Sequence, residues 1–96
     1  MKVVWTPLAV DRASEITEHI ALDNPTAASQ WVEGLFKTVE RLAKFPKHGR
    51  VVPEVGRSDI RELLYESYRI IYRVELKRVS ILTVRHGRRL IDKKEL

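Results

Sequence analysis

The sequence predicts an α+β fold: a two-layer sandwich in the order β-α-α-β-β-β, with a helical hairpin on one face of a mainly antiparallel four-stranded sheet. Two observations lead to this expectation. Apolar residues recur at helical spacing through the first half of the chain, and they alternate with polar residues at strand spacing in the second half. No repeat or low-complexity stretch interrupts the 96 residues, so residues 1–96 are expected to form one domain.

Both predicted helices begin with the same pair of signals. Thr6-Pro7 and Asn24-Pro25 each place a capping side chain before a proline at the first helical position. The second helix is expected to end before Pro46. Each helix then has one apolar face, formed by Ala9, Ala13, Ile16 and Ile20 in the first and by Ala28, Trp31, Leu35, Val39 and Leu42 in the second. We expect these two faces to lie on the sheet.

Four segments are predicted strands: residues 2–6, 59–65, 68–76 and 79–85. Short links join the last three, which favours an antiparallel meander. In the third, Tyr68, Ile70 and Tyr72 point toward the helices, and Arg69, Ile71 and Arg73 point away.

The register of the last two strands depends on their turn. A two-residue turn at Lys77-Arg78 would pair 71 with 84 and 69 with 86. Arg69 and His86 would then be neighbours on the face that the helices leave open. An odd-length loop or a bulge would shift this register by one residue.

On that register, the open face carries an apolar strip of Ile71, Leu82 and Val84, with Leu64 beside it. Such a strip is larger than a small monomer usually exposes to water. The C-terminal segment LIDKKEL, a second subunit or a partner protein should cover it. We assign Ile71, Leu82 and Val84 to partner binding.

The net charge of +5 is unevenly distributed. Residues 1–48 contain six basic and six acidic residues, whereas residues 49–96 contain twelve basic and seven acidic ones. This asymmetry favours a polyanionic or acidic partner. The chain has no cysteine, and its three histidines lack metal-ligand spacing, so no metal or cofactor is expected. Neither a signal peptide nor a membrane-spanning segment is apparent, which predicts a cytoplasmic protein.

Three segments together resemble the RelE/ParE superfamily of bacterial type II toxins: GRVVPEVGR at 49–57, YRIIYRV at 68–74 and VRHGRR at 84–89. The resemblance covers nearly the whole chain. It implies a growth-arresting toxin with a cognate antitoxin, whose acidic or amphipathic segment would wrap the basic toxin in a hetero-oligomer.

The superfamily has two biochemistries. RelE- and YoeB-like members cut mRNA in the ribosome, and this metal-free cleavage is the leading prediction. It needs a base, a cation on the phosphate and an acid, roles for which Glu54, Arg69 and His86 are the candidates. Further cationic side chains would bind the nucleic acid: Arg57, Arg61, Arg73, Arg88 and Arg89.

Two alternative functions remain open. ParE-like members inhibit DNA gyrase and are not nucleases; this chain has Gly87 where YoeB-like toxins have an aromatic residue. A non-enzymatic nucleic-acid-binding adaptor would use the same basic surface. Each candidate catalytic residue also has a structural alternative. Glu54 could pair with Arg50 or Arg57, Arg69 could be a solvated strand residue, and His86 could make a turn hydrogen bond.

Overall fold

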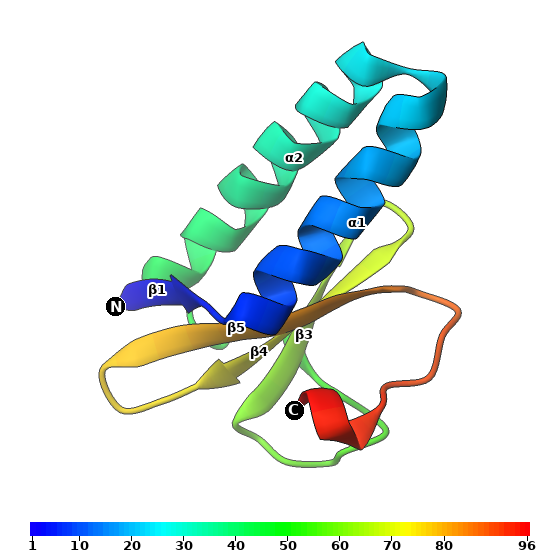
Figure 1. Ribbon diagram of the computed structural model, residues 1–96. Helices are drawn as coiled ribbons and strands as arrows, with labels where there is room; N and C mark the ends of the chain where they lie inside the picture. Colours follow the sequence, from blue (N-terminus) through cyan, green and yellow to red (C-terminus); the bar gives the residue numbers. More distant parts are fainter.

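The computed structural model describes residues 1–96 and consists of two long helices packed on a sheet of five strands (Figure 1). Along the chain the elements are β1 (Lys2–Trp5), α1 (Pro7–Asp23), α2 (Pro25–Glu40), the 3₁₀ turn η1 (Arg41–Ala43), β2 (Arg50–Val51), β3 (Ile60–Tyr65), β4 (Tyr68–Val74), β5 (Arg78–His86) and the 3₁₀ turn η2 (Lys93–Glu95). The strand order in the sheet is β1-β5-β4-β3-β2. The fold is therefore α+β.

The helix starts are where the sequence predicts them. The Thr6 side chain accepts a hydrogen bond from the Ala9 amide, and the Asn24 side chain accepts one from the Ala27 amide. Each cap is followed by a proline at the first helical position. Because Asn24 both ends α1 and caps α2, the two helices form a tight hairpin with no intervening loop.

The predicted four-stranded, mainly antiparallel sheet is wrong, because the sheet is mixed and has five strands. β1 lies parallel to β5, with Lys2 opposite Arg78 and Trp5 opposite Ile81. A parallel neighbour distant in the sequence leaves no turn signal between the two strands, so the local pattern could not reveal it. The fifth strand, β2, has only two residues, too few to show an alternating pattern.

The predicted register of β4 and β5 is also wrong, by one residue over residues 68–71 and by two over residues 72–74. Ile71 pairs with Thr83, and Arg69 pairs with Arg85. The register shifts between Ile71 and Tyr72, since Tyr72 pairs with Ile81, and Leu82 is therefore an extra residue in β5. Such a bulge places two consecutive side chains of one strand opposite one residue of its neighbour.

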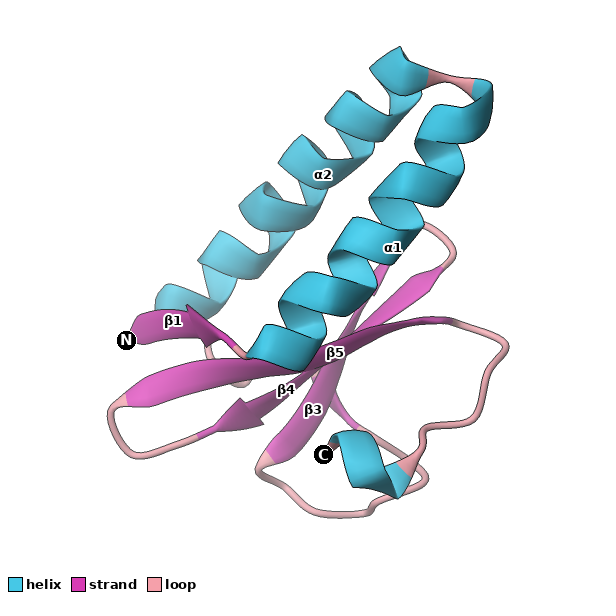
Figure 2. Cartoon of the chain, in the orientation of Figure 1, coloured by secondary structure: helices cyan, strands magenta, loops and turns pink.

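The main core lies between the helices and the sheet. Its buried side chains include Trp31 and Leu35 from α2 and Ile70 and Tyr72 from β4, as expected. Ile16 and Ile20 of α1 pack against this cluster while remaining partly exposed. Figure 2 shows both helices on one side of the sheet, so Arg69, on the opposite face of β4, does not lie beneath them.

The opposite face of the sheet is not open, because the C-terminal segment of this chain covers it. A second apolar cluster of Val52, Ile60, Ile71, Leu82 and Ile91 forms there. In Figure 1 the red C-terminal turn lies on the side of the sheet away from the helices. Of the three residues expected in a bare strip, Ile71 and Leu82 are buried in this cluster. Val84 is buried on the helix side, opposite Ile70.

Candidate functional site

Arg69 is the centre of a charged network on the sheet face away from the helices. Its Nη1 and Nη2 donate to the two carboxylate oxygens of Glu54, each at 2.8 Å. Its Nε and Nη2 donate to Glu62, with an Nη2–Oε1 distance of 2.5 Å. Two parallel N–H···O bonds of this kind are the strongest arrangement open to an arginine and a carboxylate. Arg69 is thus held by two acids, and only 6% of its surface is exposed.

Glu62 is a member of this network that the sequence did not single out. Its side chain is fully buried, and Arg50 provides a second basic partner at 3.1 Å from Oε2. Its position in the strand could have identified it. Alternate residues of a strand share a face, so Glu62 lies on the same face as Ile60 and Leu64, and it is an acid between two apolar residues. Leu64 pairs with Arg69, which puts Glu62 diagonally across from the arginine.

The ion pair sets the protonation of both partners. The hydrogen bonds from Arg69 are the main cause that lowers the pKa of Glu54 to about 2, against an opposing effect of burial. The hydrogen bonds to Glu54 in turn raise the pKa of Arg69 above its ordinary value. Glu54 is therefore a carboxylate, and Arg69 a cation, at every pH in which the protein would work.

The same network binds the C-terminal segment to the sheet. Arg69 Nη1 also donates to the main-chain oxygen of Arg89, at 3.2 Å, and the amide of Ile91 donates to Glu54 Oε2, at 3.2 Å. Both Nη groups and the Nε of Arg69 therefore have acceptors within the chain. No N–H direction of this arginine is left for a bound phosphate.

His86 lies away from this network. It pairs with Tyr68 rather than with Arg69, so its side chain is on the face of the sheet that carries the helices. The ring makes an edge contact with Tyr68, with centroids 5.6 Å apart, and Nδ1 accepts a hydrogen bond from the amide of Arg88. The structure therefore brings Glu54 and Arg69 together and places His86 across the sheet from them.

Three of the arginines predicted to bind nucleic acid are engaged within the chain. Arg57 forms an ion pair with Asp59, at 2.7 Å. Arg61 donates to the main-chain oxygens of Ser58 and Gly49, and Arg73 donates to the main-chain oxygen of Leu96. The other two, Arg88 and Arg89, are exposed in the loop after β5.

A second charged cluster holds the end of the chain. Glu95 accepts hydrogen bonds from Arg12 of α1 and from Thr83 of β5, and it forms an ion pair with Arg85 at 3.0 Å. Burial raises the pKa of Glu95, but the hydrogen bonds and charges of these neighbours outweigh it, so the net shift is downward. Sequence spacing gives no sign of this cluster, since its members come from three distant segments.

The molecule has neither a metal-binding cluster nor a membrane-spanning helix. No group of three or more His, Cys, Asp or Glu side chains could hold a metal ion. Neither long helix has the length and apolar character needed to cross a lipid bilayer.

Comparisons with known proteins agree with this architecture. The chain is 37% identical over 89 residues to Y4kP of Sinorhizobium fredii (strain NBRC 101917 / NGR234), a protein named as a candidate toxin, covering 90% of this chain and 88% of that protein. It also resembles a solved chain described as a chromosomal ParDE TA system from P. aeruginosa. That match has a TM-score of 0.75 and 25% identity, and it covers 90% of this chain and 95% of the other. A family model described as ParE toxin of type II toxin-antitoxin system, parDE, matches residues 3–91. The chain therefore belongs to the ParE toxin family of type II toxin–antitoxin systems.

Proposed function

We propose that this toxin arrests growth by inhibiting DNA gyrase, without cutting RNA, and that a cognate antitoxin neutralises it. The observation that carries the proposal is the engagement of Arg69: the residue best placed to hold a phosphate is bound to Glu54 and Glu62. This reverses the order of the two mechanisms that the sequence suggested, in which mRNA cleavage came first.

Metal-free RNA cleavage needs a base and an acid in one site, and the arrangement of Glu54 and His86 suits this poorly. The base must take a proton from the 2′-hydroxyl, and a carboxylate with a pKa of about 2 is a weak base for that task. The acid must reach the leaving oxygen from the same site, whereas His86 lies on the other face of the sheet from Arg69. A nuclease would have to break the buried ion pair and reorganise the end of β5 before any chemistry.

Family membership supports the same choice. The matching family is named for the ParE toxin of the parDE system. The sequence resemblance described above implies gyrase inhibition for ParE-like members of the superfamily. A protein that works by binding another protein needs no catalytic constellation. Here the charged groups of Arg69, Glu54 and Glu62 have a structural use, since they hold β3, β4, the loop after β2 and the C-terminal segment together.

The antitoxin is the second part of the proposal. The solved relative is described as a ParDE toxin–antitoxin system, and the excess positive charge of residues 49–96 suits an acidic partner segment. Ile71 and Leu82 could contact that partner only if the C-terminal segment moved away, because Ile91 packs against them. We therefore expect the antitoxin to bind without requiring these residues.

The test uses two assays on the same protein preparation. In the first, purified toxin is titrated into a gyrase supercoiling reaction with relaxed plasmid, and the topoisomers are separated on a gel. Addition of the product of the neighbouring antitoxin gene should restore supercoiling. In the second, primer extension maps message ends in cells that express the toxin, alongside cells that express His86→Ala.

We expect supercoiling to be blocked and the messages to remain intact in both strains. Unaffected supercoiling, together with cuts that appear with the wild type and vanish with His86→Ala, would establish the nuclease mechanism instead. Since His86 is exposed, this variant should fold normally, which circular dichroism can verify.

A further inference from the structure

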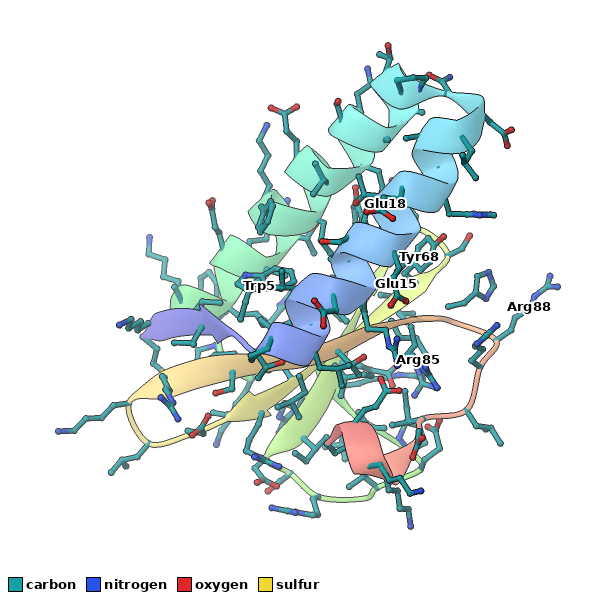
Figure 3. All side chains as sticks on the ribbon, in the orientation of Figure 1. Trp5, Glu15, Glu18, Tyr68, Arg85 and Arg88 are labelled. Carbon is teal, nitrogen blue, oxygen red and sulfur yellow. The ribbon has the colours of Figure 1, made fainter.

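Most arginines of the second half of the chain have acceptors within the chain, and the two that do not lie in the loop after β5. Of its nine arginines, seven donate to, or pair with, an oxygen of the chain itself: Arg50, Arg57, Arg61, Arg69, Arg73, Arg78 and Arg85. The side chains of Arg88 and Arg89 have no such partner. Figure 3 shows Arg88 extending from this loop away from the body of the molecule.

A cleft of about 410 Å³ lies directly beside this loop. Its walls come from the side of α1, from the end of β5 and from the loop itself, and its lining comprises Arg12, Glu15, Ile16, His19, Tyr68, Val84, Arg85, His86 and Arg89. Figure 3 shows Glu15 close to Tyr68, and Arg85 on the other side of the β5 ribbon from them.

Some charges in the cleft cancel and others do not. Arg12 pairs with Glu15 and Glu95, and Arg85 pairs with Glu95, so these four charges largely cancel. Arg89, His86 and His19 are exposed and have no acidic partner. Beside the balanced charges, the cleft therefore has one unpaired cation, Arg89, and two exposed imidazoles.

We infer that this cleft binds a backbone phosphate of duplex DNA, with Arg89 as the principal cation and His19 facing it from α1. An arginine fork matches phosphate oxygens in geometry and charge, and imidazole N–H groups add further donors. The inference rests on the proposed function, because a toxin seated on gyrase would be next to the DNA that the enzyme holds. It adds a direct contact with that DNA.

The side chains that line the cleft favour duplex DNA over single-stranded RNA. Proteins that bind single strands stack the bases on exposed aromatic side chains. No Trp or Phe lines this cleft, and Tyr68 is half-buried, with its ring already in contact with the rings of Trp31 and His86. What remains is an electrostatic site suited to a sugar-phosphate backbone.

The experiment measures DNA binding without gyrase, so its result does not depend on the supercoiling assay. Fluorescence anisotropy follows the toxin titrated into a short labelled DNA duplex of two helical turns, at several salt concentrations. The variants are Arg89→Glu and His19→Glu, which lie on different elements. The control is Lys77→Glu, which makes the same change of charge as Arg89→Glu, in the turn at the opposite end of β5, and is also exposed. A single-stranded RNA of equal length serves as the competing ligand.

We expect the wild type to bind the duplex and Arg89→Glu to bind about tenfold more weakly. For that variant, the slope of the logarithm of the binding constant against the logarithm of the salt concentration should decrease by the amount expected for about one phosphate contact. His19→Glu should also weaken binding, while Lys77→Glu should change it less than either. Equal losses in all three variants would show only a general effect of charge and would overturn the site. Absence of duplex binding by the wild type, or tighter binding of the RNA, would overturn it as well. Inhibition of gyrase without DNA binding would refute this inference and leave the proposed function intact.

Discussion

Arg69 and Glu54 face each other as parallel forks, with both N–H···O distances at 2.8 Å, in a position where only 7% of the arginine side chain is exposed. The pair joins the middle strand of the sheet to the loop after β2. Because Glu54 also accepts from the Ile91 amide, the same carboxylate fixes the C-terminal segment. Arg69, predicted from the sequence to hold a phosphate, with a solvated strand residue as the alternative, is buried and holds these segments together.

The first prediction concerns the loss of this anchor. Arg69→Ala leaves the fully buried Glu62 with one remaining cation, Arg50, whose own side chain is largely exposed. Removal of one partner from a buried ion pair typically costs about 3–5 kcal/mol, and we expect a loss of that size in urea denaturation. Arg88→Ala, the control, should change stability by less than about 0.5 kcal/mol. A loss below about 1 kcal/mol for Arg69→Ala would contradict the structural role assigned here.

The second prediction follows from the low pKa of Glu54. Because its folded-state pKa, about 2, lies below the ordinary value of 4.5, the ion pair stabilises the protein fully above pH 4.5 and progressively less as the pH falls toward 2. Glu54→Gln removes this contribution, so at neutral pH the variant should be less stable by about 2–3 kcal/mol. The difference between wild type and variant should shrink between pH 4.5 and pH 2. Denaturation curves of both proteins across this range test it, and a constant difference would contradict the assignment.

The third prediction uses two adjacent residues of the C-terminal segment. Ile91 is 8% exposed and packs on Ile71 and Leu82, whereas Leu90 is 79% exposed. Ile91→Ala should therefore destabilise the protein by about 2–3 kcal/mol and increase binding of a hydrophobic dye. Leu90→Ala should have an effect within about 0.5 kcal/mol. Equal, small effects of both changes on the unfolding midpoint would mean that the segment does not cover the sheet in solution.

The fourth prediction reverses the usual rule for glycine in a helix. Helix propensity alone favours alanine over glycine by about 0.8–1.0 kcal/mol. A Cβ at Gly34 in α2, however, would overlap the hydroxyl of Tyr65, which donates to the Trp31 main-chain oxygen at 2.8 Å. We expect Gly34→Ala to lower stability by about 1–2 kcal/mol through this clash and the lost hydrogen bond.

A double-mutant cycle tests the origin of that loss. In a Tyr65→Phe background the hydroxyl is gone, so the further cost of Gly34→Ala should be smaller than in the wild type. Ser29→Ala, at an exposed position of the same helix, is the control and should leave stability unchanged or raise it slightly. If Gly34→Ala stabilises the protein as the control does, the packing of Tyr65 against α2 is looser than described.

The elements that could be predicted are those with local signals. Thr6-Pro7 and Asn24-Pro25 marked both helix starts because capping depends on neighbouring residues. The alternation of Tyr68 to Val74 identified β4 and its two faces correctly. The parallel partner of β1 and the bulge at Leu82 could not be predicted, because both depend on how distant segments pack and neither has a turn or glycine signal.

The same distinction applies to the candidate site. Glu54 and Arg69 were placed in one site, and they are in contact. His86 was placed beside Arg69 only through the register, so the one-residue shift moved it across the sheet. Glu62 was missed because a buried acid within a strand is recognisable only when its cation is known to lie diagonally opposite.

The pairing of β1 with β5 has a consequence for how the toxin is made. Residues 2–5 form their ladder with residues 78–81, and the amide of Thr6 bonds to the oxygen of Ile81, so the first strand has no sheet partner until residues 78–81 have been synthesised. The helical hairpin, whose contacts are local, can form earlier, while the ribosome still holds the strands. Pairings between such distant segments are slow to form and dominate the folding time. The edge of the sheet formed by β1 would therefore be completed late, and an antitoxin already present would meet a chain that has not finished folding.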